Sequence, residues 1–378
     1  MKQNWNLLGF FLLSIIFLHS CSSSNSNDEK VDLDISTKEP SSTCSSGENL
    51  FPVSGSGSFN ITEDTISFMI HALSDVNQVP SFNSFSSPDG SDIKSMLSQN
   101  RSDIPWRGEK YSNVMIPISS IYQATSGFWN YSTSSTTTLC LTTRKGTISN
   151  NPTIKIQPYI TGSTYTSNDI SSALTIMKTI YSTNGVTLNV LGTSTLSESK
   201  YARVSKDFTN SVTSEMVSKG LADRVNLFFI SDYTDASYLG NSSGIPGSQG
   251  LKGSHNGVLI SISAHEKQDG SGLNDQLLGE TAAHEMGHFL GLWHPTEGYQ
   301  YKKYGLDYDP ITDTPQCPSS NNTNNDSKLT AEECGQEYGA DNLMFWSPWT
   351  NSLNVRLGDQ DNLTEGQVYV LKRALIAK

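Results

Sequence analysis

Apolar residues recur every three or four positions in three stretches of the chain after residue 145, which predicts three amphipathic helices. The first stretch runs from residue 168 to residue 181. The second begins at Asn274 or Asp275, either of which can cap a helix, and the third begins at Thr364, which has capping-box spacing with Gln367. The apolar stripes are Ile170, Leu174, Met177 and Ile180; Leu277, Leu278, Ala282, Met286 and Phe289; and Val368, Leu371 and Leu375.

Short runs of β-branched or alternating residues, separated by Ser, Gly, Asn and Pro, predict strands. Only strands are expected before residue 145, and they are mixed with helices after it, in the order strand, helix, strand, strand, strand, helix. We therefore expect an all-β sandwich domain over residues 49–144 and an α+β domain over residues 145–378. The strands are predicted at 58–61, 66–71, 114–118, 139–143, 153–160, 186–191, 225–230 and 258–262.

The beginning of the chain has the pattern of an export signal. Lys2 precedes a twelve-residue apolar run from Leu7 to Leu18, which is too short to span a bilayer and predicts a signal peptide over residues 1–20. The ending Leu18-His19-Ser20-Cys21 resembles a bacterial lipobox, which would make Cys21 a lipidated first residue; His19 is unusual there, and plain secretion is the alternative. Residues 21–48 are rich in Ser, Asn, Asp and Glu, which predicts a flexible tether.

Composition narrows the classes of partner. The formal net charge is −12, the sequence pI is near 5.0 and no basic cluster occurs, which argues against nucleic acid and against an anionic membrane surface. A chain of 378 residues with 35% hydrophobic residues and a mean hydropathy of −0.38 is typical of a soluble globular protein. We expect a monomer that contacts a membrane only through its lipid anchor, at the bacterial cell envelope or surface, or that is secreted.

The chain has five cysteines. If Cys21 carries lipid, four remain, and an even number in an exported protein indicates two disulfides. Three pairings are open; Cys44 with Cys140 and Cys317 with Cys334 are favoured because each pair stays within one region. Free thiols are the alternative, and no C-x-x-C spacing supports a metal site at these residues.

The sequence from His284 to His294 reads H-E-x-x-H-x-x-G-x-x-H. His284 and His288 lie four residues apart, on one helical face, and can bind the same ion. Gly291 can adopt the left-handed conformation that ends a helix and brings His294 in as a third ligand. Three nitrogens leave one coordination position open, as in catalytic zinc sites, and Glu285 is placed to act as a general base on water. A chance match to the whole pattern is on the order of one in ten thousand.

This motif, its preceding strands and helix, and Met344 about fifty residues later resemble a metzincin metallopeptidase. The resemblance covers roughly residues 153–378 and implies a twisted mixed sheet, an active-site helix and a lower subdomain. It implies that Met344 lies in a tight turn beneath one catalytic Zn²⁺ as an apolar floor, and that the substrate is a protein or peptide.

Two further stretches resemble the pappalysin type of metzincin: Asp309 to Pro315, with the pattern D-x-x-x-D-T-P, and the start of the last helix at Leu363 to Gln367. That resemblance allows structural Ca²⁺ at Asp309 and Asp313, and solvated loop acids are the alternative.

The chain departs from this pattern at two positions. Trp346 stands two residues after Met344, where many relatives have a tyrosine; an indole can donate one hydrogen bond but cannot bind zinc, so Trp346 is a candidate oxyanion or substrate contact. Pro295 follows His294 as in serralysin-like enzymes, which leaves the subfamily open.

Residues 65–71 and 87–90 faintly resemble jelly-roll modules attached to secreted bacterial proteases. In the β region we expect core positions, rather than a binding face, for Trp106, Trp129 and Tyr131, and an ordinary strand position for His71. His255 and His265 are expected in surface or loop roles rather than in the cleft.

The sequence therefore predicts an exported zinc endopeptidase. Two alternatives stay open: a surface binding or adhesion protein built on a scaffold that has lost turnover, and a zinc hydrolase of a non-peptide amide.

Overall fold

The structure is a computed structural model, and it describes residues 48–73, 82–93, 113–235, 237–253, 256–298, 308–326, 328–351 and 355–378. All of these fall in one compact unit of the chain, residues 36–378. We call residues 48–145 of it the β module and residues 146–378 the α/β region. No helix in the described part is long and apolar enough to cross a membrane. The predicted signal peptide, Cys21, Cys44, Trp106 and His255 lie outside the described residues.

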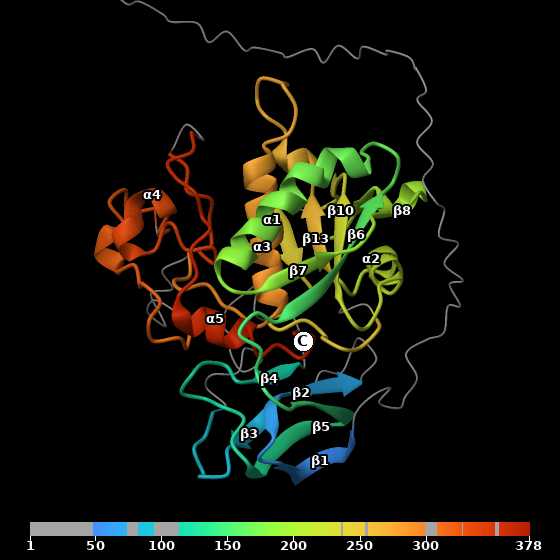
Figure 1. Ribbon diagram of the computed structural model, residues 1–378, viewed down its shortest axis with the longest axis vertical. Helices are drawn as coiled ribbons and strands as arrows, with labels where there is room; N and C mark the ends of the chain where they lie inside the picture. The colour runs from blue at the N-terminus through green and yellow to red at the C-terminus, as the bar shows by residue number, and fades with distance from the viewer. Residues whose placement is uncertain are drawn as a thin grey trace, which may run out of the picture. The chain divides into compact units, whose positions relative to one another are not determined.

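The β module is one antiparallel sheet organised around its longest strand (Figure 1). That strand, β5, pairs with β1 over most of its length, with β3 near its beginning and with β2 near its end, and β4 pairs with β2. The strands are β1 (Glu48–Ile61), β2 (Thr65–Leu73), β3 (Phe82–Ser86), β4 (Val114–Ile116) and β5 (Gly127–Lys145).

The sandwich predicted for this region is, among the described residues, a single sheet. The physical reason is the length of β5, which at 19 residues extends past each shorter partner and belongs to both halves of the sheet. Apolar side chains from all five strands form one cluster. Trp129 and Tyr131 are buried in it, which confirms their predicted core positions, and the ring of Trp129 meets that of Phe68 edge-on with centroids 5.0 Å apart.

Two of the predicted residues of this module lie opposite each other in the sheet. His71 is on β2, as expected, in register with Cys140 on β5. Cys140 is disulfide-bonded, and its partner lies outside the described residues. The domain boundary predicted between residues 144 and 145 remains a prediction.

The α/β region contains a six-stranded mixed sheet in the order β12-β13-β10-β6-β7, with β8 also paired to β6. All neighbouring pairs are parallel except β12, which runs antiparallel to β13 at one end of the described sheet. The strands are β6 (Thr153–Thr161), β7 (Thr187–Val190), β8 (Ser194–Leu196), β10 (Val225–Ile230), β12 (Gly240–Ser242) and β13 (Val258–Ser261); β9 (Arg203–Val204) and β11 (Asp232–Tyr233) form a separate short pair.

Helices cover both faces of this sheet (Figure 1). Leu227 and Phe229 of β10 pack in the cluster that contains α1 (Ser171–Thr183) and α3 (Asp275–Phe289), whereas Phe228 and Ile230 pack in the cluster that contains α2 (Ser211–Val217). Successive strand residues point to opposite faces. The uninterrupted apolar sequence of β10 is therefore explained by burial on both sides.

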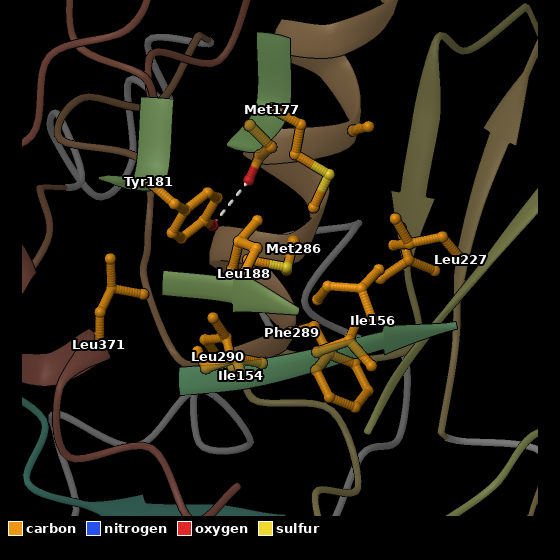
Figure 2. Close-up of a cluster of buried hydrophobic side chains, with 14 of the residues drawn as sticks. Ile154, Ile156, Met177, Tyr181, Leu188, Leu227, Met286, Phe289, Leu290 and Leu371 are labelled. Carbon is orange, nitrogen blue, oxygen red and sulfur yellow. Dashed lines mark hydrogen bonds between the residues drawn. The ribbon is translucent and has the colours of Figure 1, made fainter. Parts of the chain in front are cut away.

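Helix α3 is held against the sheet and against α1. Figure 2 shows Met286 and Phe289 of α3 in one cluster with Ile154 and Ile156 of β6. Tyr181 of α1 is fully buried, and its hydroxyl donates to the backbone carbonyl of Ala283 at 3.0 Å, the dashed line in Figure 2. The two helices approach closely because Gly279 has no side chain: a Cβ there would lie 2.8 Å from the carbonyl oxygen of Ala173.

The predicted helices are all present, with differences at their ends. A 3-10 turn (Ser167–Ile170) precedes α1, and Asn274 caps α3 by accepting a hydrogen bond from the backbone of Leu277 at 3.2 Å. Leu277 itself is half-buried, unlike the rest of its stripe. The sequence did not predict α2, α4 (Ala331–Cys334), β3, β8, β9, β11 or β12, because these elements are too short for a clear apolar period.

The C-terminal part consists of loops, 3-10 turns and two short helices, α4 (Ala331–Cys334) and α5 (Glu365–Leu371). Cys317 and Cys334 form the predicted disulfide, next to a small apolar cluster. The capping box of Thr364 and Gln367 is present. Leu371 and Leu375 of the predicted apolar face are buried, as expected, whereas Val368 is only half-buried and Val370 is buried as well. The remaining 3-10 turns are Ser199–Tyr201, Ser263–His265, Ser319–Asn321 and Gln336–Tyr338.

Candidate metal centre

The end of α3 and the turn after it bring three histidines together. His284 and His288 lie one turn apart on the helix. The chain then reverses at Gly291, whose φ of 109° is in the left-handed region, and the backbone N–H of Leu292 donates to the carbonyl of Gly287 at 2.9 Å. This turn returns the chain toward the helix and places His294 beside the first two histidines, as the sequence predicts.

The three imidazoles converge through the same ring nitrogen. The Nε2 atoms of His288 and His294 are 3.0 Å apart, those of His294 and His284 are 3.3 Å apart, and the three possible ligand atoms all lie within 4.8 Å of one another. Two Zn–N bonds of 2.0–2.1 Å at a tetrahedral angle would place their nitrogens about 3.3 Å apart. The spacing therefore fits one zinc ion.

The other ring nitrogen of each histidine has an acceptor. Nδ1 of His284 lies 2.7 Å from the carbonyl oxygen of Leu343, and Nδ1 of His288 lies 2.8 Å from that of Leu292. A carbonyl oxygen can only accept, so in the neutral rings these Nδ1 atoms carry the hydrogen and the Nε2 lone pairs face the centre. Lone pairs that meet at this distance repel unless a cation lies between them. The tautomers, like the spacing, fit a bound metal.

The third histidine is oriented by a charged group. Nδ1 of His294 lies 3.1 Å from a carboxylate oxygen of Glu297, whose side chain is only 3% exposed. A carboxylate behind a metal-binding histidine fixes the ring and increases its basicity. We did not predict Glu297 from the sequence; its position three residues after the last histidine was the available signal.

Glu285 is on α3, and its side chain faces the edge strand β12. A Cβ on Gly240 of β12 would come within 2.5 Å of Cγ of Glu285, so only glycine lets the strand pass this closely. Burial raises the pKa of Glu285 to about 8, opposed by a hydrogen bond from the backbone of Ser242. The burial that raises this pKa is produced by the neighbouring strand and helix.

Met344 occupies the position predicted for a methionine turn. It is fully buried, its backbone N–H donates to Oδ1 of Asn342 at 2.9 Å, and its sulfur packs against Gly287 of α3. The preceding residue, Leu343, supplies the carbonyl that orients His284. This turn therefore supports the site through both an apolar contact and a hydrogen bond.

The role predicted for Trp346 is not supported. Its one N–H donor points to the carbonyl oxygen of Leu329 at 2.5 Å, and its ring covers Gly298, where a Cβ would lie 2.3 Å from ring carbons. Because an indole has only this one donor, Trp346 has none left for a substrate oxyanion in this arrangement. It packs with the small cluster of the C-terminal part instead.

The candidate calcium residues have other contacts. The two carboxylate oxygens of Asp313 accept hydrogen bonds of 2.9 Å from the hydroxyl of Thr364 and the backbone of Gly366, at the beginning of α5. Asp309 is buried, accepts a hydrogen bond of 2.6 Å from Thr314, and has its pKa raised to about 7 by burial. Among the residues described, only the three histidines form a group of three such ligands close enough to share an ion, so the calcium prediction gains no support.

His265 was expected in a surface or loop role, but this expectation is wrong, because the structure buries its side chain. Its side chain is 1% exposed, with Nδ1 lying 2.6 Å from the carbonyl oxygen of Ser261 and Nε2 lying 2.9 Å from the hydroxyl of Thr281. It therefore links the end of β13 to α3, and burial lowers its pKa to about 4. An isolated polar residue between two elements has no periodicity from which this burial could be predicted.

Residues 167–295 match the model of the metallo-peptidase family M12B, reprolysin-like, a segment that includes the three histidines and Glu285. These findings support a metzincin-type metallopeptidase domain. A curated relative, an extracellular metalloprotease of Colletotrichum graminicola (strain M1.001 / M2 / FGSC 10212), is 43% identical over 61 residues, or 16% of this chain and 20% of that protein. The chain thus matches about a fifth of that relative's length.

One solved structure, metalloproteinase-II from Bacteroides fragilis, is similar to part of this chain at 17% identity. The similarity covers 39% of this chain and 45% of that one, with a TM-score of 0.25.

Proposed function

We propose that the chain is an exported zinc endopeptidase of the pappalysin type that hydrolyses protein or peptide substrates. The observation that carries this proposal is the convergence of three histidine Nε2 atoms within a few ångströms of one another, next to the buried carboxyl group of Glu285. His284, His288 and His294 would hold one Zn²⁺. When bound, zinc supplies a Lewis acid that polarises a carbonyl and increases the acidity of water.

Glu285 acts as the general base and then as the general acid. Its carboxylate takes a proton from the water whose oxygen attacks the peptide carbonyl carbon, and it gives that proton to the leaving amine nitrogen as the C–N bond breaks. The products are a carboxylate and an amine. The side chain of Glu285 is buried against Gly240 of β12 and directly follows the ligand His284 on α3, which places its carboxyl group beside the metal centre.

The edge strand β12 supports a peptide as the substrate rather than another amide. Within the described part of the sheet, β12 pairs with β13 on one side only, so backbone groups on its other side face away from the sheet. An extended peptide can add to such an edge as a further strand. Bound there, it would pass Glu285, because Gly240 lies against that side chain.

The pappalysin assignment is supported by a contact between the two stretches that suggested it. Asp313, from the D-x-x-x-D-T-P stretch, accepts hydrogen bonds from Thr364 and Gly366 at the start of the last helix. Export, as a monomer anchored by a lipid on Cys21 or secreted, is supported by the N-terminal apolar run, by the Cys317–Cys334 disulfide and by the extracellular designation of the fungal relative.

Peptide digestion tests this function. The purified full chain is loaded with zinc and incubated with a peptide library, alongside Glu285→Gln, a chelated sample and a control variant, Glu332→Gln, whose side chain is exposed on the C-terminal part. We expect the wild type and Glu332→Gln to cleave, and the other two samples to lose at least about a hundredfold in rate. Zinc binding without cleavage in the wild type would support the binding or adhesion alternative instead.

A further inference from the structure

Strand β4, and β2 over residues 67–70, are buried on both of their faces. Phe68 and Ile116, which are register partners, belong to the apolar cluster of the β module, whereas the next pair in register, Met69 and Met115, belongs to the core cluster of the α/β region. Alternation along a strand explains this division. The two methionines therefore extend out of the β module into the core that contains α3.

Met115 reaches the turn that follows the zinc-binding helix. A Cβ on Gly291 would lie 2.7 Å from the terminal methyl group of Met115. Met115 is 4% exposed, and Leu290 and Leu292, on either side of the glycine, belong to the same cluster. The side chain of Met115 thus fills the space that opens where the chain reverses toward His294.

Polar contacts hold this arrangement in place. The side-chain amide of Gln249 donates to the carbonyl of Phe289 at 3.2 Å and to the sulfur of Met115 at 3.5 Å. Phe289 is the last residue of α3, and its carbonyl also accepts from the backbone of Gly247 at 3.0 Å, so an acceptor that the helix leaves without a partner is satisfied. Asn113, before β4, donates to Ser248 at 2.7 Å in a buried position.

We propose that Met115 is a positioning residue of the metal centre: it packs on the Gly291 turn and thereby holds His294 in the position required for zinc binding. This inference rests on the proposed zinc site. It makes the β module a support of that site, because the residue comes from a strand more than a hundred positions earlier in the chain.

Zinc affinity in matched variants tests the proposal. The full chain is prepared as wild type, Met115→Ala, Met115→Leu and Ile116→Ala, and the zinc dissociation constant is measured by competition with a chromophoric chelator, below the temperature at which any variant unfolds. Ile116 is the control, because it is fully buried next to Met115 on the same strand but faces the cluster of the β module. We expect zinc to bind about tenfold more weakly to Met115→Ala, as for other residues that orient metal ligands.

Met115→Leu, which keeps most of the side-chain volume, should restore wild-type affinity, and Ile116→Ala should keep it even if its melting temperature falls as far as that of Met115→Ala. Equal zinc affinity in the wild type and Met115→Ala, or equal weakening in both alanine variants, would overturn the proposal. Should Met115→Ala not fold, Met115→Val provides a smaller truncation with the same expected order. A wild-type chain that binds no zinc would overturn the proposed function itself.

Discussion

The sulfur of Met344 lies so close to the backbone of Gly287 that a Cβ on this glycine would come within 2.4 Å of it. Gly287 directly precedes His288 on α3, and Met344 directly follows Leu343, whose carbonyl accepts from Nδ1 of His284. The distance between the helix and the methionine turn is therefore set by the absence of a side chain at Gly287.

Gly287→Ala should destabilise the protein. The added methyl group has to displace a fully buried methionine, and overpacking of this kind costs about 1–3 kcal/mol of unfolding free energy. Urea unfolding of the zinc-free protein measures it. Gly192→Ala is the control, because a Cβ at Gly192 meets nothing within 4 Å. In the double variant with Met344→Ala the penalty of the added methyl group should shrink, and strict additivity of the two single changes would contradict the contact.

Glu297→Gln should weaken zinc binding by about 10–100-fold, because the amide still accepts from His294 but no longer supplies a negative charge behind the ring. The measurement is the zinc dissociation constant, with the exposed Glu332→Gln as the charge-matched control. Unchanged zinc affinity in Glu297→Gln would mean that the carboxylate only packs against His294.

Because His265 is buried, the unfolding free energy of the protein should fall as the pH falls from 6.5 to 4. The pKa in the folded state is about 4 and the unfolded value is about 6.5, so in this window the unfolded chain binds the proton first and is favoured. The difference between the two pKa values corresponds to roughly 3 kcal/mol of unfolding free energy. This contribution is present in full above pH 6.5 and is lost by pH 4. Urea unfolding of wild type and His265→Gln, with chelator present, measures it.

Comparing the wild type with His265→Gln isolates the contribution of His265 to the pH dependence of stability. Asp309, with its pKa raised to about 7 in the folded state, shifts stability in the opposite direction over an overlapping window, and it does so in both proteins. The unfolding free energy of His265→Gln should therefore depend less steeply on pH than that of the wild type below pH 6.5. Parallel curves would show that the buried imidazole is not the source.

Trp346→Phe should keep kcat within about twofold of the wild type and lower the unfolding free energy by about 1 kcal/mol, since the change removes the hydrogen bond to Leu329. An oxyanion donor behaves differently, because its removal lowers kcat by about 10²–10³-fold. Steady-state peptide hydrolysis and thermal unfolding on the same samples distinguish the two roles.

Features that follow from a spacing or pairing rule were predictable, and contacts set by the packing of elements were not, even at similar separations in sequence. His284, His288 and Gly291 follow from helix geometry, and Cys317 and Cys334 follow from the pairing expected of two cysteines within one region. The hydrogen bond from His265 to Thr281 joins two elements, and the indole of Trp346 finds its acceptor in a loop 17 residues earlier. These contacts depend on how the elements pack, which no periodicity encodes.

The same limit applies to the β module. Parts of β1, β2, β4 and β5 were predicted, since β-branched and aromatic residues mark them. Strand β3 and the role of β5 as the shared partner were not predicted, because register depends on pairing between distant segments. Similarly, Met69 and Met115 look like ordinary members of apolar strands. Only the assembled fold shows that they belong to the core of the other region.

The pairing of β5 with strands far away in sequence also has a consequence for the rate of folding. Ile61 pairs with Gly127 and Glu48 with Leu141, so β1 has no partner until a segment far along the chain has been made. Contacts this distant in sequence make folding slow and leave unpaired strands exposed to aggregation in the meantime. The proposed packing of Met115 on the Gly291 turn requires strand β4 to be in place. We therefore expect zinc binding to appear in a late, concerted step of refolding rather than with the first helices.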